Sequence, residues 1–409
     1  KGSSKAAPKA VSKPTSKKAS KSKGEKRYTA SDIEVLEGLE PVRRRPGMYI
    51  GGTDERALHH LAAEILDNAM DEAVAGHANR IDFILESATT LTIRDNGRGM
   101  PTGKHPKFPE KSAVEVIMTT LHAGGKFSGK TYATSGGLHG VGASVVNALS
   151  SAMTVEIARE KLLYRQEFSR GMPVTALNEI GTAPNRRGTA VTFTPDNEIF
   201  GETAKFRAAT LYRMARSKAY LFAGVEIRWR CDPALLTSND SIPAEASLHF
   251  PGGLADALND ATHDKGLMIS SPFAEMAELD GQKFEWAITW LDASEDGFFS
   301  SYCNTVPTPS GGTHETGFRQ AIVRALRAFG ELVGNKKAAD ISADDALANS
   351  AVMLSVFLRD PQFQGQTKDR LVSTDATRLT EQAVRDRFDH WLSSDTARAT
   401  YLLETAIDR

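Results

Sequence analysis

The sequence predicts an α+β protein with two folded domains. Residues 58–73 carry apolar side chains at helical spacing, and the runs IDFIL and LTI that follow within 80–94 are typical of strands. A second group of strands and helices begins after residue 247. With 409 residues, of which 40% are hydrophobic, the chain is long enough to bury a core in each domain.

A basic tail precedes the first domain. Residues 1–27 contain ten Lys or Arg and one Glu, a net charge of +9, whereas the rest of the chain carries −10. The tail has almost nothing apolar to bury, so we expect it to be disordered. A cationic arm suits the phosphate backbone of a nucleic acid, but solubility tails and expression remnants share this composition.

The sequence shows no membrane-spanning or secretory pattern. No apolar run approaches the roughly 18 residues that a membrane span needs, and no signal peptide is recognisable. The two cysteines, Cys231 and Cys303, form no metal-binding or disulfide pattern. We therefore expect a cytoplasmic protein with reduced thiols.

The helix predicted over 58–73 has an apolar face and a polar arc. The apolar face comprises Leu58, Leu61, Ile65, Leu66, Ala69, Met70 and Ala73. The polar arc comprises His60, Glu64, Asp67, Asn68 and Asp71. Glu64 and Asn68 lie one turn apart. The Glu64 carboxylate can activate water there, and the neighbouring Asn68 carboxamide can supply an oxygen ligand for Mg²⁺. Glu64 and His60 are candidate catalytic residues, and a plain solvated helix face is the alternative.

Asp95 stands at the end of the second predicted strand, before two glycines. The segment comprises Asp95, Asn96, Gly97, Arg98, Gly99, Met100 and Pro101. A carboxylate held there can accept a hydrogen bond from an exocyclic amine, such as that of adenine, while the glycines let the ring approach the backbone. An Asp-Gly turn between strands is the alternative.

A glycine-rich loop leads into a helix predicted at 143–150. It comprises Gly136, Gly137, Leu138, His139, Gly140, Val141 and Gly142. Such a loop at a helix N-terminus presents backbone N–H groups to phosphate. The sequence is neither a Walker A motif nor an ordered GxGxxG, so a P-loop or Rossmann site is not supported.

Residues 102–142 are predicted to form a lid that ends in this loop. The segment is rich in Gly, Lys and Ser, and a helix is predicted at 112–122, where Ser112 and Glu115 form a capping box. A flexible segment at a phosphate loop is suited to closing over a nucleotide. Lys126 and Tyr132 would then reach the phosphates, or else remain exposed loop residues.

Further elements complete the two domains. A capping box of Ser31 and Glu34 predicts a helix at 31–40. The rest of the first domain is predicted as strands 154–158, 163–168, 189–195 and 225–230 and helix 203–220, with helices on one face of a mixed sheet. The pattern fades between 231 and 247. The second domain is predicted to contain strands 284–292, 302–308 and 351–363 and helix 315–332.

Several separated motifs resemble known families. Glu64 with Asn68, residues 95–99 (DNGRG) and residues 137–142 (GLHGVG) resemble the three ordered motifs of the GHKL ATPases. A closer resemblance is to the B subunits of bacterial type II topoisomerases, carried by RPGMYIG at 45–51, HAGGKF at 122–127, GGTH at 311–314 and QTKD at 366–369. GLEPVRRR at 38–45 resembles the topoisomerase IV branch more than gyrase.

The resemblance implies the domain organisation and the cofactors. A GHKL (Bergerat) sandwich is expected over 28–235, with an N-terminal arm at 28–52, and a transducer domain of the ribosomal S5 domain 2-like fold over 236–409. ATP and Mg²⁺ are the implied cofactors. Glu64 would be the general base, Asn68 the Mg²⁺ ligand and Asp95 the adenine acceptor.

The resemblance also implies further nucleotide-binding residues. They are Arg98, Gly99, Met100, Pro101, Lys126, Tyr132, Gly137, Leu138, His139, Gly140, Val141, Gly142, Arg165 and Thr189. Tyr28 would contact the nucleotide of a partner subunit. Gln366 and Lys368 would lie on a transducer loop that senses the γ-phosphate, because a lysine on a separate domain gains a charge-assisted contact only when that phosphate is present.

The implied partners are DNA, a topoisomerase A subunit and a second B subunit in an ATP-dependent homodimer. The A subunit would carry the cleaving tyrosine, so this chain alone should not cut DNA. Arg319, Arg324 and Arg327, on the helix after residue 315, would face DNA or only solvent. The alternatives are gyrase B, a mismatch-repair or chaperone ATPase, a sensor kinase, for which no phospho-acceptor helix is recognisable, and a non-enzymatic ATP-gated clamp.

Overall fold

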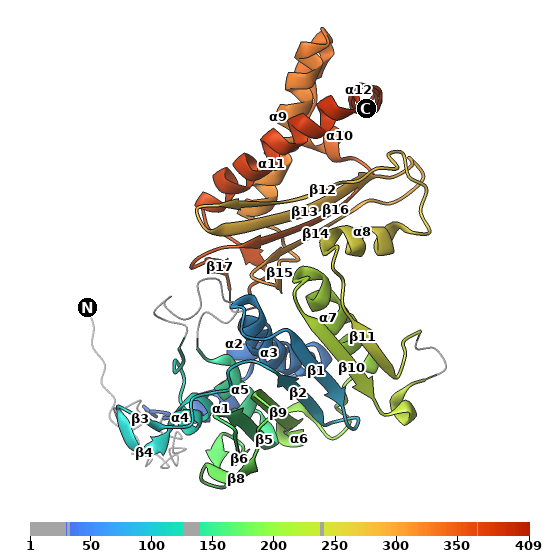
Figure 1. Cartoon of the computed structure of the whole chain (residues 1–409). Helices are drawn as coiled ribbons and strands as arrows, with labels where there is room; N and C mark the ends of the chain where they lie inside the picture. Colours follow the sequence, from blue (N-terminus) through green and yellow to red (C-terminus); the bar gives the residue numbers. More distant parts are fainter. Residues whose placement is uncertain (1–29, 31–32, 126–139, 238–240, 366) are drawn as a thin grey trace, which may run out of the picture. The chain divides into compact units, whose positions relative to one another are not determined.

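A mixed sheet forms the centre of the first domain (Figure 1). The computed structural model describes residues 30, 33–125, 140–237, 241–365 and 367–409. The sheet contains β1 Arg80–Leu85, β2 Leu91–Asp95, β5 Ser150–Arg159, β6 Leu162–Ser169, β7 Met172–Pro173, β8 Asn178–Thr182, β9 Gly188–Pro195, β10 Glu226–Cys231 and β11 Glu245–Leu248. Their order is β11-β10-β1-β2-β9-β5-β6-β7, with β8 paired to β6. β1 and β10 run parallel, and β1 and β2 antiparallel.

The first domain also contains helices and a small hairpin. They are α1 Glu40–Arg44, α2 Gly47–Ile50, α3 Glu55–Val74, the hairpin of β3 Lys104–His105 and β4 Phe108–Ser112, α4 Ala113–Thr119, α5 Gly142–Ala148, α6 Asn197–Phe200 and α7 Ala208–Leu221. A 3₁₀ turn follows at Pro233–Leu235. Apolar side chains of α3, α5 and α7 share one core with the sheet. The opposite side of β1, β2 and β10 carries charged side chains such as Asp82, Arg94 and Arg228, so helices cover one face only.

The longest helix of the first domain begins at a capped terminus. Asp54 accepts a hydrogen bond from the backbone N–H of Ala57 at 2.9 Å, which satisfies a donor that the first turn leaves open. Leu61, Leu66 and Met70 are fully buried along the apolar face. Burial of this face, more than helix propensity, stabilises α3 and fixes its polar side.

The second domain has a smaller mixed sheet between two helical layers. Its strands are β12 Phe273–Leu279, β13 Gln282–Trp290, β14 Phe298–Cys303, β15 Val306–Pro307 and β16 Ser350–Phe357, in the order β12-β13-β16-β14-β15. Its helices are α8 Leu254–Thr262, α9 Thr313–Leu332, α10 Ala343–Leu347, α11 Asp375–Ser394 and α12 Thr396–Ile407. A 3₁₀ helix, Lys336–Asp340, and a ribbon of β17 Phe363–Gln364 and β18 Arg370–Leu371 complete it.

Alternation along β13 explains the two layers of the second domain. Trp286 and Trp290 point into the core shared with α9 and α11, whereas Ala287 and Leu291 pack with α8. α9 and α11 lie against each other over the sheet (Figure 1). Residues 37–409, which include both sheets, form one compact unit.

The arm does not form the helix predicted at 31–40. Residues 33–37 have no regular structure, and a helix begins only at Glu40, with Pro41 in its first turn. Ile33 and Val35 are exposed, so this segment buries no apolar face. Gly38 adopts φ +61°, which interrupts the helical path.

Three other boundaries differ from the sequence prediction. The strand predicted at 302–308 is two strands, β14 and β15, joined by a tight turn at Asn304 and Thr305. The strand predicted to end at residue 363 ends at Phe357. The first sheet gains β11, so it extends to Leu248, beyond the predicted domain boundary at 235. The tight turn divides the first of these strands, and pairing with β10 adds β11 to the first sheet.

Candidate nucleotide-binding site

α3 presents Glu64 and Asn68 to a cavity of about 410 Å³. Both residues line its wall, one helical turn apart, as the polar arc predicted. His60 Nε2 lies 3.2 Å from Glu64 Oε1, but His60 is not among the residues that line the cavity. His60 therefore contacts the Glu64 carboxylate from behind and does not face the cavity itself.

Asp95 is a buried carboxylate at the end of β2. It accepts hydrogen bonds from the backbone N–H of Gly97 at 2.7 Å and of Thr189 at 3.4 Å. Burial raises the pKa of Asp95 to about 6, and the neighbouring charge of Glu72 adds to the rise, while the Gly97 hydrogen bond opposes it. A perturbed carboxylate in a cavity wall is typical of a functional group.

The turn after Asp95 is held by Glu72, one further turn along α3. Glu72 accepts hydrogen bonds from the backbone N–H of Arg98 at 2.9 Å and from its guanidinium at 2.6 Å. A Cβ atom at Gly97 would lie 2.6 Å from the Glu72 carboxylate, so glycine is needed there. Thr189 accepts a hydrogen bond from the backbone N–H of Met100 at 3.1 Å. These contacts place Gly99, Met100 and Pro101 in the wall of the cavity.

The end of the glycine-rich loop closes the cavity against α3. Gly140, Val141 and Gly142 line it, and Gly140 has φ +60°. A Cβ atom at Gly142 would lie 2.1 Å from Glu64 Oε2. Only glycine allows the backbone at the start of α5 to approach the carboxylate this closely.

Lys368 reaches the same cavity from the second domain. Its side chain is 7% exposed, its φ is +59°, and it lines the cavity. Asp369, the next residue, lies 3.6 Å from the guanidinium of Arg56, which belongs to the first domain. The fold thus brings a lysine next to residues more than 200 positions away in the sequence, and the cavity is complete only with both domains.

The other predicted site residues fall outside this group. Arg165 is not part of the lining: it is 45% exposed and pairs with Glu156 at 2.6 Å. Arg165 lies opposite Glu156 of β5, and the nucleotide-binding role that the resemblance implies for it stays a prediction. Seven predicted residues lie outside the described part of the chain: Tyr28, Lys126, Tyr132, Gly137, Leu138, His139 and Gln366.

Two charged residues of the cavity were not predicted. Arg159 lines it and donates a hydrogen bond to the Gly99 carbonyl at 2.9 Å. Glu72 lines it as well. The spacing of Glu64, Asn68 and Glu72 at successive turns is a signal that identifies Glu72 from the sequence. Arg159 has no such signal, because only the pairing of β5 with β9 brings it near Gly99.

The basic stripe on α9 is engaged within the second domain. Arg324 pairs with Glu381 of α11, Arg327 donates to the Ile341 carbonyl at 2.6 Å, and Arg319 lies over the ring of Phe299 at 5.0 Å. These partners explain the stripe structurally. The expectation that it faces DNA stays a prediction.

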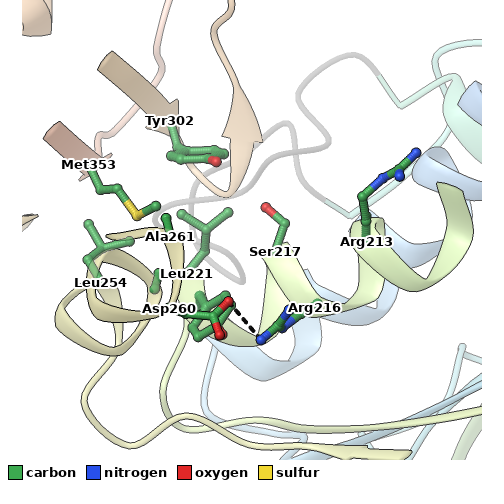
Figure 2. Close-up of a pocket in the computed structure, with 11 residues that line it drawn as sticks. Arg213, Arg216, Ser217, Leu221, Leu254, Asp260, Ala261, Tyr302 and Met353 are labelled. Carbon is green, nitrogen blue, oxygen red and sulfur yellow. Dashed lines mark ion pairs between the residues drawn. The ribbon is translucent and has the colours of Figure 1, made fainter. Parts of the chain in front are cut away.

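A second, smaller cavity of about 200 Å³ lies along α7 and α8 (Figure 2). Arg216 and Asp260 form an ion pair at 2.7 Å in its wall, and the Arg216 guanidinium lies 5.6 Å from the centre of the Tyr220 ring. Tyr302 and Met353 of the second domain face it (Figure 2). Arg216 already has a carboxylate partner, so no charge in this pair awaits a ligand.

Membrane spans and metal clusters are both absent from the described ranges. No helix there is both long and apolar enough to cross a membrane. Over the same residues, no three His, Cys, Asp or Glu side chains cluster as a metal site would require.

The fold and cavity define the class of the protein. The first domain is a mixed sheet with helices on one face. Its cavity is lined by the helix that carries Glu64 and Asn68, by the turn after Asp95 and by the end of the glycine-rich loop. This is the arrangement of the GHKL ATPases. Residues 53–199 match the family of histidine kinase-, DNA gyrase B- and HSP90-like ATPases, and residues 253–409 match the DNA gyrase B family.

Solved structures narrow this class. The 43K ATPase domain of Thermus thermophilus gyrase B, in complex with an aminocoumarin, is 36% identical, with a TM-score of 0.74 over 90% of this chain and 94% of that one. The topoisomerase IV ATP-binding domain of Francisella tularensis, in complex with a small-molecule inhibitor, is 31% identical, with a TM-score of 0.74 over 91% and 97%. The chain belongs to the B-subunit family of bacterial type II topoisomerases.

Curated relatives favour one branch of this family. The DNA topoisomerase 4 B subunit of Bartonella bacilliformis is 58% identical over 93% of this chain, and that of Caulobacter vibrioides is 56% identical over 93%. A DNA gyrase B subunit from Halalkalibacterium halodurans is 39% identical. The chain spans 55% of the length of the first two relatives. The predicted GHKL sandwich followed by a transducer domain is confirmed.

Proposed function

We propose that this chain binds and hydrolyses ATP as the energy-converting part of a topoisomerase IV-like B subunit. One observation carries the proposal: Glu64, Asn68, Asp95, the end of the glycine-rich loop at 140–142 and Lys368 meet in one cavity, although they lie far apart in the sequence. A solvated helix face and an Asp-Gly turn, the alternatives for these residues, do not explain this convergence.

The chemistry follows from the position of each group. Glu64 accepts a proton from the attacking water, while His60 holds its carboxylate in place at 3.2 Å. Asp95 accepts a hydrogen bond from the adenine amine in a buried wall, where an unpaired donor is costly. The backbone N–H groups at Gly140 to Gly142 stabilise charge on the phosphate oxygens, and Lys368 adds a charge-assisted contact.

The residues present fit a magnesium ion bound together with the triphosphate. The cavity offers the Asn68 carboxamide oxygen and the Glu64 carboxylate, rather than a complete set of protein ligands. Mg²⁺ commonly takes one or two protein oxygens and completes its shell with substrate phosphates and water. When bound, the ion would neutralise phosphate charge, with Asn68 as its protein ligand.

The activity of the complete protein is also part of the proposal. ATP closes two B subunits into a gate, with Tyr28 reaching the nucleotide of the partner subunit, and a DNA segment passes through it in the cytoplasm. Cleavage of DNA belongs to a separate A subunit. Because these relatives are named as B subunits of topoisomerase 4, we expect decatenation rather than supercoiling. Assays of both reactions, with the full-length protein and its A subunit, decide between topoisomerase IV and gyrase.

Steady-state ATP hydrolysis tests the proposal on this chain. We expect Glu64→Ala to reduce kcat by about 10²–10⁴-fold with little change in nucleotide affinity, because a general base acts mainly in the transition state. Glu179→Ala, at an exposed position of β8, is the matched control. Nucleotide binding without hydrolysis by the unmodified chain would favour the non-enzymatic clamp. Turnover of Glu64→Ala within threefold of wild type would exclude Glu64 as the base.

A further inference from the structure

A buried lysine connects the catalytic helix to the second domain. Lys218, on α7, is 4% exposed, and its ammonium group lies 2.5 Å from Asp67 Oδ1 on α3. The same ammonium donates a hydrogen bond to the Thr305 carbonyl at 2.5 Å, in the turn between β14 and β15. One side chain thus ties together two helices of the first domain and a turn of the second.

The place of this contact on α3 is informative. Asp67 directly precedes Asn68 and lies within one turn of Glu64, so Lys218 holds α3 at the level of the catalytic groups. Asp67 lies on the polar arc, for which a solvated face was the alternative, but it is only 9% exposed. Burying an ammonium and a carboxylate is costly, and apolar residues of similar size often serve stability as well or better. A geometric role explains this pair better than stability does.

The turn at the other end leads toward Lys368. Asn304 and Thr305 both have positive φ, +50° and +64°, and this conformation is unfavourable for a β-branched threonine. The Asn304 side chain fixes the turn, because it accepts from the Leu358 N–H at 2.8 Å and donates to the Leu358 carbonyl at 3.0 Å. Leu358 follows β16 directly and begins the segment that carries Lys368 into the cavity.

Contacts beside Lys368 itself are weaker anchors. Arg56 lies 3.6 Å from Asp369, but its side chain is 80% exposed. A methyl group of Thr367 lies 3.3 Å from where a Cβ atom of Gly51 would be. An exposed ion pair contributes little to fixing two domains. The buried hydrogen bond from Lys218 to the Thr305 carbonyl is therefore a stronger link between the two domains than the exposed pair of Arg56 and Asp369.

We propose that Lys218 is a positioning residue for hydrolysis. Its contacts fix the position of α3 relative to the β14–β15 turn, so that Lys368 and Glu64 face the same phosphate. This inference rests on the proposed ATPase function. The path runs from Asp67 through Lys218, Thr305 and Asn304 to Leu358. Lys218 itself touches no nucleotide, so its effect on turnover passes through Lys368.

The test combines Lys218→Met with Lys368→Ala. Lys218→Met keeps the aliphatic stem and removes the ammonium. We expect it to lower kcat about tenfold in the wild-type background and less than twofold in the Lys368→Ala background, because residues on one path are not additive. Lys265→Met is the matched control: Lys265 also pairs with an acid, Glu295 at 3.2 Å, and a carbonyl, that of Asp296 at 3.3 Å, but within the second domain alone.

The outcomes separate the inference from a structural effect and from the proposed function. If Lys218→Met leaves an uncompensated carboxylate and does not fold, Asp67→Asn combined with Lys218→Met removes both charges and serves instead. Equal losses of kcat in both Lys368 backgrounds, or turnover equal to that of Lys265→Met, would overturn the inference. If the unmodified chain does not hydrolyse ATP, the proposed function itself fails.

Discussion

At the scale of single residues, the cavity depends on glycine where its walls meet. We expect Gly142→Ala to lower kcat by about 10²-fold, because the new methyl group displaces the Glu64 carboxylate and small misplacements of a catalytic group are costly. Steady-state ATP hydrolysis measures the effect. Gly181→Ala is the control, because nothing lies within 4 Å of a Cβ atom there. Equal turnover in the two variants would contradict the close approach.

Asp95 makes the free energy of unfolding depend on pH. Its pKa is about 6 in the folded protein and 3.8 ordinarily, so between these values the folded state keeps a proton that the unfolded state has lost. The contribution of Asp95 to stability therefore falls as the pH rises from about 4 to 6 and is then level. The cost at neutral pH is roughly 3 kcal/mol, at about 1.4 kcal/mol per pKa unit.

Asp95→Asn should remove this dependence. The variant keeps an oxygen that accepts from Gly97, so it should gain stability over wild type as the pH rises from 4 to 6, in the absence of nucleotide. Urea unfolding of both proteins across this range measures the difference. A difference that stays constant with pH would show that the Asp95 carboxyl titrates normally.

Single residues also mark where sequence reasoning succeeded and where it did not. Spacing on one helix was enough to place Glu64 and Asn68 in a common cavity. It was not enough to tell that Asp67, on the same arc, is buried, because its partner Lys218 lies 151 positions away. Arg159 ends β5 and Arg165 lies within β6, and only the pairing of these strands with their neighbours decides that Arg159 lines the cavity and Arg165 does not.

At the scale of elements, local signals were reliable where a tertiary contact supported them. Ser112 is the N-cap of α4: its hydroxyl accepts from the Glu115 N–H at 3.0 Å, and α4 packs Val114 and Met118 into the core. The same signal at Ser31 predicted a helix in the arm, where residues 33–37 are irregular and no apolar side packs. Burial of one face distinguishes the two segments, and the local sequence does not report it.

The cap of α4 gives a prediction at this scale. Ser112→Ala removes the side-chain acceptor and should cost about 1 kcal/mol of unfolding free energy. Urea unfolding measures it. Ser393→Ala, in the last turn of α11, is a suitable control because its hydroxyl donates only to the Asp389 carbonyl of its own helix. A loss no larger than that of the control would contradict a role for the cap.

At the scale of the whole molecule, the position of Lys368 predicts how nucleotide controls assembly. A non-hydrolysable ATP analogue should convert the chain from monomer to dimer, whereas ADP, which lacks the γ-phosphate, should do so weakly or not at all. Lys368→Ala should remove most of this difference. Light scattering measures the mass in each state.

Lys265→Ala controls for the loss of a lysine elsewhere in the second domain. Equal mass with analogue, with ADP and without nucleotide would contradict the gate. An unchanged response in Lys368→Ala would contradict only the sensing role of this lysine. Together with the hydrolysis data, these outcomes separate assembly from catalysis.

The two buried cysteines can report the transient opening of each domain. Cys231 ends β10 in the first domain and Cys303 ends β14 in the second, and both are buried. Burial raises the pKa of Cys303, so this thiol is inert in the closed fold and an alkylating reagent reaches it only during transient opening. Each domain thus carries one chemical reporter, without any engineered label. The ratio of the two alkylation rates tells whether the two domains open together or separately.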